Sequence, residues 1–270
     1  PAANKIPQTI KKATIFLFIM DLLYYIMRLI YNFILDLIFP KFCVGCEKEG
    51  NFLCQKCQND ILEVNMQVCP SCGRLSENGI YCENCRLEVI LVPQKGKKKP
   101  KKIFRRKPLQ GIISTLYFEE GPTKEIIHNF KYNSVLEFKD ILAEKMAEKI
   151  EILSDIDVIT FAPLHPRRFA QRGYNQAELL TEEIARKKKI EMRELIVKIK
   201  NTKRQVGLKG RKRRQNLKNV FRAKKGIDIK GKKIIIVDDI CTTGTTLNEC
   251  ARVLKKAGAR EVWGLVVARG

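Results

Sequence analysis

The hydrophobic pattern from residue 109 onwards alternates between short apolar runs and longer amphipathic stretches. Four apolar runs have the length and composition of buried strands: 111–120, 157–163, 232–240 and 261–269. Four stretches between them are typical of helices: 122–131, 138–152, 175–189 and 245–258. Strands that alternate with helices predict an α/β domain over residues 109–270, built on a mainly parallel, twisted sheet flanked by helices.

The N-terminal pattern is different, because residues 14–39 are strongly apolar but are interrupted at the spacing of one helical face. The interrupting residues are Asp21, Arg28, Asn32 and Asp36. We therefore expect residues 1–40 to form a tail and an amphipathic helix that ends at Pro40. The longest apolar run is too short to span a bilayer, and no cleavage site of a signal peptide follows it. The helix then docks on protein or lies at a membrane surface, and both alternatives stay open.

The charge of the chain narrows the class of partner. The 270 residues carry a formal charge of +23, which favours phosphates, nucleic acid or an anionic surface. The segment 94–108 is rich in lysine and arginine, has no acidic residue and is broken by Gly96, Pro100 and Pro108. It predicts a basic linker over residues 93–108, either solvated or lying along a nucleic-acid backbone.

Most of the cysteines form CxxC pairs within residues 41–92. Two such turns complete a tetrahedral zinc site with sulfur ligands at about 2.3 Å, and no position stays open for catalysis. Neighbouring pairs predict two structural zinc ions, one held by Cys43, Cys46, Cys54 and Cys57 and the other by Cys69, Cys72, Cys82 and Cys85. An interleaved arrangement uses the same cysteines. Disulfides are disfavoured because nothing else indicates secretion, and the regular spacing disfavours an iron–sulfur cluster.

The segment IIIVDDICTTGTT, residues 234–246, is the strongest chemical signal. Asp238 and Asp239 end a buried strand, and the loop that leads into the next helix follows with Thr242, Thr243, Gly244, Thr245 and Thr246. Parallel sheets bind ligands at the carboxyl ends of their strands, and such a loop before a helix N-terminus suits a phosphate. Carboxylates repel phosphate, so we expect the two aspartates to face hydroxyls or a metal, as in a ribose phosphate with Mg2+.

Two basic blocks accompany this segment. In the first, residues 162–180, the turn Pro163, Leu164 and His165 follows a strand, with Arg167, Arg168 and Arg172 just beyond it. We expect these arginines to supply positive charge to a bound anion, with His165 as a candidate general base. Alternatively, the arginines cap a helix and pair with Glu178 or Glu182.

The second block, residues 201–221, combines two glycines with many basic residues, including Lys203, Arg204, Lys209, Arg211, Lys212, Arg213 and Arg214. Its glycines and its charge suit either a mobile loop or a contact with a nucleic-acid backbone.

These motifs together resemble the ComF family of competence-associated phosphoribosyltransferase-like proteins over roughly residues 37–270, and residues 234–246 are similar to the signature of type I phosphoribosyltransferases. The resemblance implies a type I phosphoribosyltransferase-like domain preceded by a double zinc ribbon. It implies that phosphoribosyl pyrophosphate (PRPP) binds with Mg2+, with Asp238 and Asp239 on the ribose hydroxyls and residues 242–246 on the 5′-phosphate. It also implies that Pro163, Leu164 and His165 meet the pyrophosphate and that residues 201–221 form a mobile loop that closes over the site. If the protein is an enzyme, the catalytic candidates are Asp238, Asp239, Arg167, Arg168 and Arg172.

The resemblance also implies a cytoplasmic protein of natural competence that handles incoming single-stranded DNA with a helicase-type partner. Membrane contact through residues 14–39 stays open. His128 and Lys131 match the family pattern, although a helix histidine is more often held by its neighbours. Two functions remain, a Mg2+-dependent phosphoribosyltransferase of unknown acceptor and a non-catalytic DNA-binding adaptor that uses the PRPP site as a sensor or scaffold. Cys241, Cys250 and Trp263 are interpreted as packing residues.

Overall fold

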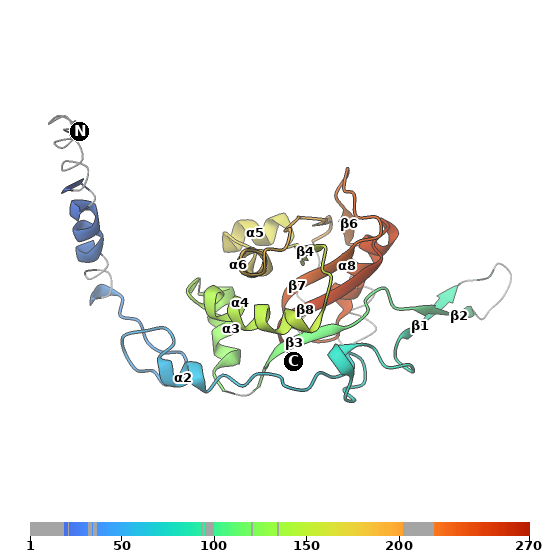
Figure 1. Cartoon of the computed structure of the whole chain (residues 1–270), viewed down its shortest axis with the longest axis horizontal. Helices are drawn as coiled ribbons and strands as arrows, with labels where there is room; N and C mark the ends of the chain where they lie inside the picture. Colours follow the sequence, from blue (N-terminus) through green and yellow to red (C-terminus); the bar gives the residue numbers. More distant parts are fainter. Residues whose placement is uncertain are drawn as a thin grey trace, which may run out of the picture. The chain divides into compact units, whose positions relative to one another are not determined.

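The computed structural model describes residues 19–270 except positions 21, 32, 33, 35, 36, 93, 95–99, 120, 134 and 202–218. The chain divides into two compact units, Pro1–Gln55 and Lys56–Gly270, and Figure 1 shows the ribbon of both. In the first unit, residues 22–31 are helical and exposed, so the predicted N-terminal helix is present. Within the described residues, no helix has the length and apolar character needed to cross a membrane. The surface on which residues 14–39 dock stays a prediction.

The second unit is built on a four-stranded sheet in the order β3-β8-β7-β4. Its strands are β3 (Ile112–Tyr117), β4 (Val158–Phe161), β7 (Lys233–Cys241) and β8 (Glu261–Arg269). All three pairs of neighbours are parallel, which confirms the predicted sheet. The centre of β7 and nearly all of β8 are buried, as expected of strands covered on both faces.

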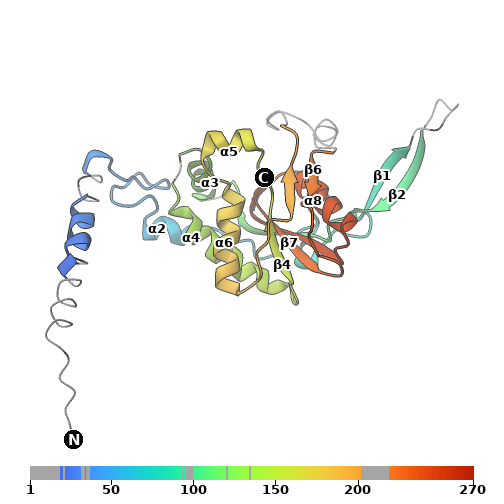
Figure 2. The same ribbon diagram turned by 90° about the horizontal axis from the view of Figure 1, so that it is seen from above.

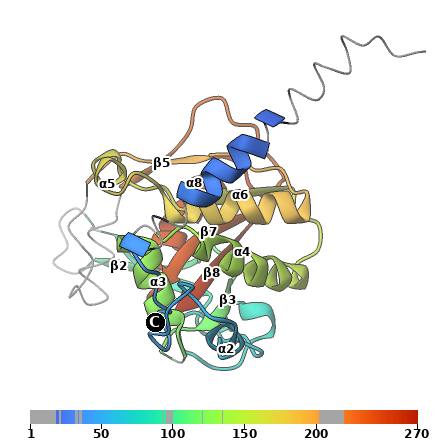
Figure 3. The ribbon, with the colours of Figure 1, turned by 90° about the vertical axis from the view of Figure 1, so that its left-hand side faces the viewer.

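Helices cover both faces of this sheet (Figures 2 and 3). The helix α4 (Phe138–Lys149), continued by η2 (Ile150–Ile152), packs against β3 and β8, and α6 (Gln176–Lys188) packs against β4 and β7. The shorter helices α3 (Thr123–Tyr132) and α5 (Pro166–Arg172) follow strand ends. The helix α8 (Thr245–Lys256) contacts β7 and β8 and also a small hairpin, β5 (Ile196–Lys198) with β6 (Phe221–Ala223).

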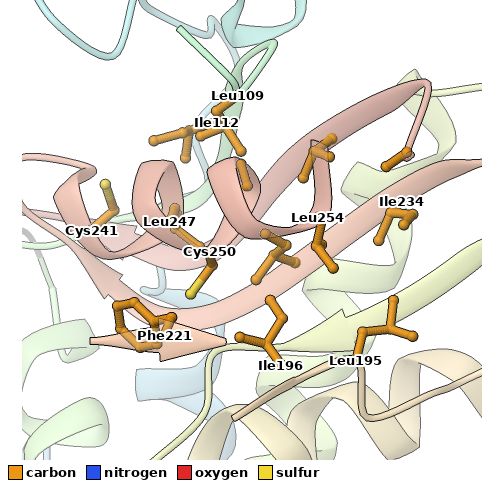
Figure 4. Packing of buried hydrophobic residues seen from close by; sticks show 14 of the residues in the cluster. Leu109, Ile112, Leu195, Ile196, Phe221, Ile234, Cys241, Leu247, Cys250 and Leu254 are labelled. Atoms are coloured by element: carbon orange, nitrogen blue, oxygen red, sulfur yellow. The ribbon is translucent and has the colours of Figure 1, made fainter. Parts of the chain in front are cut away.

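The core between α8 and its neighbours is continuous (Figure 4). Leu247, Cys250 and Leu254 of α8 lie between the sheet residue Ile234 and the hairpin residue Phe221. Cys241 and Cys250 are buried, and Trp263 is only 7% exposed, so the interpretation of all three as packing residues is confirmed. The first residues of α8 are thereby held at the carboxyl end of β7.

The cysteine-rich segment contains α2 (Gln55–Asn59), η1 (Glu77–Gly79) and β1 (Leu87–Val92). The stretch predicted as a linker contains a strand, β2 (Lys101–Arg106), which pairs antiparallel with β1. The pattern of charges did not reveal it, because all six residues of β2 are exposed and no apolar face distinguishes them from a solvated segment. The four predicted domain boundaries stay predictions.

Residues 62–67 protect the outer edge of the sheet. Val64 N–H donates to Thr115 O at 2.8 Å, and Tyr117 N–H donates to Leu62 O at 3.1 Å. One residue before Thr115, the side-chain amide of Gln67 bonds to both backbone groups of Ser114, each at 2.9 Å. The edge strand β3 is therefore hydrogen-bonded on both sides, and its backbone is closed to intermolecular pairing.

Candidate functional site

The two adjacent carboxylates lie near the end of β7, where the sequence placed them. Asp239 N–H donates to Asp238 Oδ1 at 2.9 Å, and Ile240 N–H donates to Asp239 Oδ1 at 2.5 Å. Lys131 of α3 places its Nζ 2.9 Å from Asp239 Oδ1, and the two side chains are only 16% and 14% exposed. The charge of Asp239 is thus paired by a nearly buried ammonium group.

Asp238 has a different electrostatic environment. Its burial, followed by the charge of Asp239, raises the pKa of its carboxyl to about 7, against smaller lowering effects of Lys131 and Lys198. Near neutral pH this carboxyl therefore divides its time between the protonated and the ionised form. Holding this carboxyl in a half-buried position lowers the stability of the folded protein. Carboxyls with strongly shifted pKa values are concentrated at functional sites.

The loop after β7, residues 242–246 and here called the threonine loop, connects the carboxylates to α8. Gly244 has φ +65°, the left-handed conformation that favours glycine, and an added Cβ would lie 3.0 Å from Ile112 Cδ1. Thr243 and Thr245 join their hydroxyls at 2.8 Å. The N-cap residue of α8 is Gly244, which provides no side-chain cap, and the first N–H groups of a helix have no partner within the helix, an arrangement that suits an anion.

The second predicted block lies beside this loop because β4 is the neighbour of β7. Ala162 N–H donates to Val237 O at 2.8 Å, which sets the turn Pro163, Leu164 and His165 next to the carboxylates. His165 caps α5, and its Nδ1 accepts a hydrogen bond from Arg167 N–H at 3.2 Å. Burial, then the charges of Lys198, Arg167 and Arg168, lower the pKa of His165. The imidazole is consequently neutral at pH 7, with Nε2 left to donate a hydrogen bond.

Further cations face the same region. Arg172 donates from Nη1 to Gln176 Oε1 at 3.0 Å and lies 5.0 Å from the ring centre of Tyr132. Lys198 ends β5, and burial followed by the charge of Arg168 lowers the pKa of its ammonium group. Lys198 was missed by the sequence reasoning, because β5 is only three residues long and has no periodicity of its own. The cations and the two carboxylates suit a ligand that carries both phosphates and hydroxyls.

Not every candidate residue takes part in this arrangement. His128 is exposed and its ring lies 5.0 Å from that of Tyr132, while Lys131 of the same helix pairs with Asp239. The seven candidates for nucleic-acid binding between Lys203 and Arg214 lie outside the described residues. Both interpretations of that block, a closing loop and a nucleic-acid contact, stay predictions.

The cysteines form the two predicted quartets. The sulfurs of Cys43, Cys46, Cys54 and Cys57 lie within 4.8 Å of one another, as do those of Cys69, Cys72, Cys82 and Cys85. Two measured edges, 3.6 Å for Cys46 to Cys54 and 3.8 Å for Cys72 to Cys82, match the roughly 3.8 Å edge of a tetrahedron with zinc–sulfur bonds of about 2.3 Å. The quartets thus follow the pairing of neighbours and fit zinc.

Zinc binding requires ionised thiols, and each quartet contains at least one cysteine with a lowered pKa, whereas burial and the neighbouring thiols raise the pKa of Cys85 to about 12. Burial opposes ionisation of Cys43, but backbone N–H groups of Cys54 and its own turn lower its pKa to about 6. Arg74 lowers the pKa of Cys72 to about 6 and donates to Cys82 Sγ at 3.4 Å. A guanidinium at this position offsets the negative charge of four thiolates around one dication.

Comparison with known proteins finds matches to both the parallel-sheet domain and the cysteine-rich segment. The family model "Phosphoribosyl transferase domain" matches residues 171–269, and "Double zinc ribbon domain" matches residues 34–86. "Competence protein F" of Haemophilus influenzae is 30% identical over 230 residues, which cover 81% of this chain and 98% of that protein. The chain belongs to the ComF family.

Other relatives of this ComF-family chain match over a similar length. "Competence protein ComFC" of Streptococcus pneumoniae is 26% identical over 214 residues, or 79% of this chain and 86% of the relative. "DNA utilization protein YhgH" of Escherichia coli is 28% identical over 226 residues, or 79% and 96%. The ComF-family chain therefore combines a double zinc ribbon, with two four-cysteine sites for structural zinc, and a phosphoribosyltransferase-type domain.

Proposed function

We propose that this ComF-family protein binds PRPP together with Mg2+ at the carboxyl end of β7. The observation that carries the proposal is the direct succession of two half-buried carboxylates, the left-handed turn at Gly244 and the uncapped start of α8. The carboxylates suit the ribose 2′ and 3′ hydroxyls, and the threonine loop suits the 5′-phosphate. The turn 163–165 and Arg167, Arg168 and Arg172 suit the pyrophosphate.

Pairing of Asp239 with Lys131 supports this assignment, because it holds one carboxylate in place before any ligand arrives. The neutral His165 and the nearby cations provide hydrogen-bond donors for the pyrophosphate oxygens. They bring no further carboxylate that would repel the pyrophosphate. If the protein is an enzyme, an acceptor attacks the anomeric carbon of the ribose while the bond to the pyrophosphate oxygen breaks. The basic residues then stabilise the departing pyrophosphate, and bound Mg2+ supplies further neutralisation of its charge.

The test is calorimetric titration of PRPP and Mg2+ into the zinc-loaded protein. We expect saturable binding that is lost in the double variant Asp238→Asn with Asp239→Asn. The matched control is Asp155→Asn with Asp228→Asn, which removes the same charge from two exposed positions and should leave the affinity unchanged. Absence of binding by the unaltered protein, or equal binding by both double variants, refutes the proposed site.

A second function, contact with single-stranded DNA, is favoured by the hairpin of β1 and β2. Glu88 of β1 binds Arg252 of α8 through two hydrogen bonds of 2.9 and 3.1 Å, so this face of the hairpin is turned towards α8. Neighbouring residues of a strand point to opposite faces. The register then groups on the other face, here called the outer face, the residues Leu87, Val89, Lys102, Phe104 and Arg106.

The outer face has the composition of a surface for single-stranded nucleic acid. It contains no acidic residue, its two cations flank an aromatic ring, and Phe104 is 65% exposed. Exposed aromatic rings stack on bases of any sequence, and cations beside them neutralise the phosphates. The names of the relatives, two competence proteins and a DNA utilization protein, point to the same class of partner. A helicase-type protein partner and a cytoplasmic location belong to this proposal as well.

The two faces of the hairpin supply a matched test, measured as binding of a labelled oligonucleotide at several salt concentrations. Lys102→Ala with Arg106→Ala removes two cations from the outer face, while Lys101→Ala with Arg105→Ala removes two from the opposite face. Only the double variant of the outer face should bind more weakly. The slope of its log affinity against log salt concentration should be smaller by about 1.4, which is about 0.7 for each of the two lost phosphate contacts. Equal effects of the two pairs would contradict a specific outer-face contact.

Alanine at residues 211–214 tests the predicted loop contact separately, with the same readout. Unchanged affinity and salt slope in that variant would exclude residues 211–214 as a DNA contact without affecting the outer face. If the protein binds DNA but does not bind PRPP, the adaptor function stands and the transferase function is excluded.

A further inference from the structure

The second cysteine quartet is joined to Gly244 of the threonine loop through Tyr81, the residue directly before the zinc ligand Cys82. The ring of Tyr81 is 6% exposed, and the ammonium group of Lys107 lies 4.0 Å from its centre. Asn248 of α8 donates from Nδ2 to the Tyr81 hydroxyl at 2.8 Å and to Gly244 O at 2.9 Å. One amide group thus connects the zinc ribbon to the residue at which the loop turns.

The packing around Gly244 shows how close this approach is. A Cβ at Gly244 would lie 3.5 Å from the Tyr81 hydroxyl oxygen and 3.0 Å from Ile112 Cδ1. Tyr81 and Ile112 belong to the same buried cluster as Cys69, Cys241 and Leu247. The zinc ribbon therefore forms one wall of the core that supports the threonine loop.

A second connection reaches the beginning of the loop through Arg269, at the end of β8. Its guanidinium donates to Cys69 O at 3.2 Å and to Pro70 O at 2.8 Å, within the first CxxC turn of the quartet. Arg269 lies opposite Cys241 in the β7–β8 ladder, and Gly270 N–H donates to Cys241 O at 3.2 Å. Cys241 is the residue directly before Thr242, so the zinc ribbon is linked both to the start of the threonine loop and to Gly244 at its centre.

We propose that the second zinc ribbon clamps the threonine loop, so that zinc in the quartet of Cys69, Cys72, Cys82 and Cys85 and an anion in the loop bind cooperatively. Tyr81 acts as a positioning residue in this clamp. Zinc fixes the two CxxC turns, and through them the Tyr81 hydroxyl and the carbonyl groups that hold Arg269. The loop N–H groups are then oriented before a phosphate arrives, which lowers the cost of ordering them on binding.

The proposal rests on the proposed PRPP function and adds its regulation by zinc. Coupling between two sites is reciprocal. If zinc raises the affinity of the threonine loop for an anion by some factor, the bound anion must raise the affinity of the second quartet for zinc by the same factor. The quartet of Cys43, Cys46, Cys54 and Cys57 supplies an internal comparison, since the contacts of Tyr81 and Arg269 are made at the other quartet.

The first experiment compares Tyr81→Phe with Tyr117→Phe, a tyrosine on β3 that is 39% exposed. Tyr81→Phe removes the hydroxyl that Asn248 contacts and keeps the ring and every cysteine. We expect its affinity for PRPP with Mg2+ to fall about fivefold or more, the lower end of typical coupling between sites. Both variants should keep two zinc ions per chain and similar urea midpoints, so that a lower affinity is not a general loss of structure.

The second experiment measures zinc loss to a chelator with and without PRPP, and follows exposed thiols of each quartet by alkylation and mass spectrometry. Cys72 and Cys46 are exposed and report the second and the first quartet. PRPP should slow alkylation of Cys72 about fivefold and leave that of Cys46 unchanged. In Tyr81→Phe the protection of Cys72 should disappear.

The outcomes separate the two proposals. If the unaltered protein binds PRPP, but Tyr81→Phe binds it equally well and PRPP does not protect Cys72, the clamp is wrong and the PRPP site stands. If the unaltered, zinc-loaded protein does not bind PRPP at all, the proposed function fails, and the clamp fails with it.

Discussion

Replacing Asp238 with asparagine should stabilise the folded protein, although it removes a proposed ligand-binding group. Burial and the charge of Asp239 raise the pKa of Asp238 from 3.8 to about 7. Between these values the unfolded chain has lost the proton and the folded protein has kept it. The folded state therefore binds more protons in this window, and the free energy of unfolding falls as the pH rises from about 4 to about 7.

The magnitude follows from the shift. About three pKa units at about 1.4 kcal/mol each give an upper limit of about 4 kcal/mol, reached above pH 7. Asp238 is half-buried, so screening by solvent reduces this to about 2–3 kcal/mol. Asparagine has no charge to lose and still offers an oxygen to the N–H of Asp239, now 2.9 Å from Asp238 Oδ1. The variant should thus gain about 2–3 kcal/mol at pH 8 and only about 1 kcal/mol at pH 5.

Urea unfolding of the zinc-loaded protein measures this difference, with the fluorescence of Trp263 as the probe. The chain has one tryptophan, and its side chain is 7% exposed in β8, so unfolding transfers it from the core to water. The free energy of unfolding follows from the midpoint and slope of each transition. The gain of Asp238→Asn over the unaltered protein is then compared at pH 5 and pH 8.

The adjacent Asp239→Asn is the control, and its effect should have the opposite sign. It removes the partner of Lys131, whose side chain is 16% exposed, and leaves an ammonium group without its carboxylate. We expect a loss of about 1–2 kcal/mol at pH 8, because the removal of the repulsion between Asp239 and Asp238 offsets part of the lost ion pair. A destabilised Asp238→Asn, or a gain that is the same at pH 5 and pH 8, would refute the account of Asp238 as a half-buried carboxyl opposed by its neighbour.

Three further predictions concern the residues around the site. Gln67→Ala should lower the free energy of unfolding by about 2–3 kcal/mol, because both backbone groups of Ser114 lose a partner; unchanged urea midpoints would contradict this. Gly244→Ala should cost about 1–2 kcal/mol and weaken PRPP binding, because its methyl group would lie 3.0 Å from Ile112 Cδ1 at φ +65°; calorimetry and a thermal melt test both effects. The affinity for PRPP should rise up to about tenfold from pH 6 to pH 8 as Asp238 ionises, and the same slope in Asp238→Asn would assign it to the ligand instead.

Local patterns were sufficient where a segment's own neighbours decide its structure. The strands β3, β4, β7 and β8 were predicted because each is a run of buried apolar residues, and α8 because its apolar residues recur at helical spacing. The four CxxC turns and the threonine loop are likewise contained within a few residues of chain. The zinc quartets and the family could therefore be predicted from the sequence.

Elements without a pattern of their own were missed. The strands β5 and β6 have three residues each, and their burial comes from α8, which is distant in sequence. The strand β2 is exposed throughout, and only its pairing with β1 distinguishes it from a linker. No local period records such pairings, because they are made between segments that meet only in the folded chain.

The sequence by itself determined which chemistry is present: two carboxylates, a loop for an anion and two sets of four thiols. The tertiary structure decided how these groups are connected. Lys131 pairs with Asp239, Tyr81 reaches Asn248 and Arg269 binds the turn at Cys69, each across more than a hundred residues of chain. Motif spacing reports interactions along a few turns of backbone, whereas these contacts depend on the packing of a common core, which only the complete fold specifies.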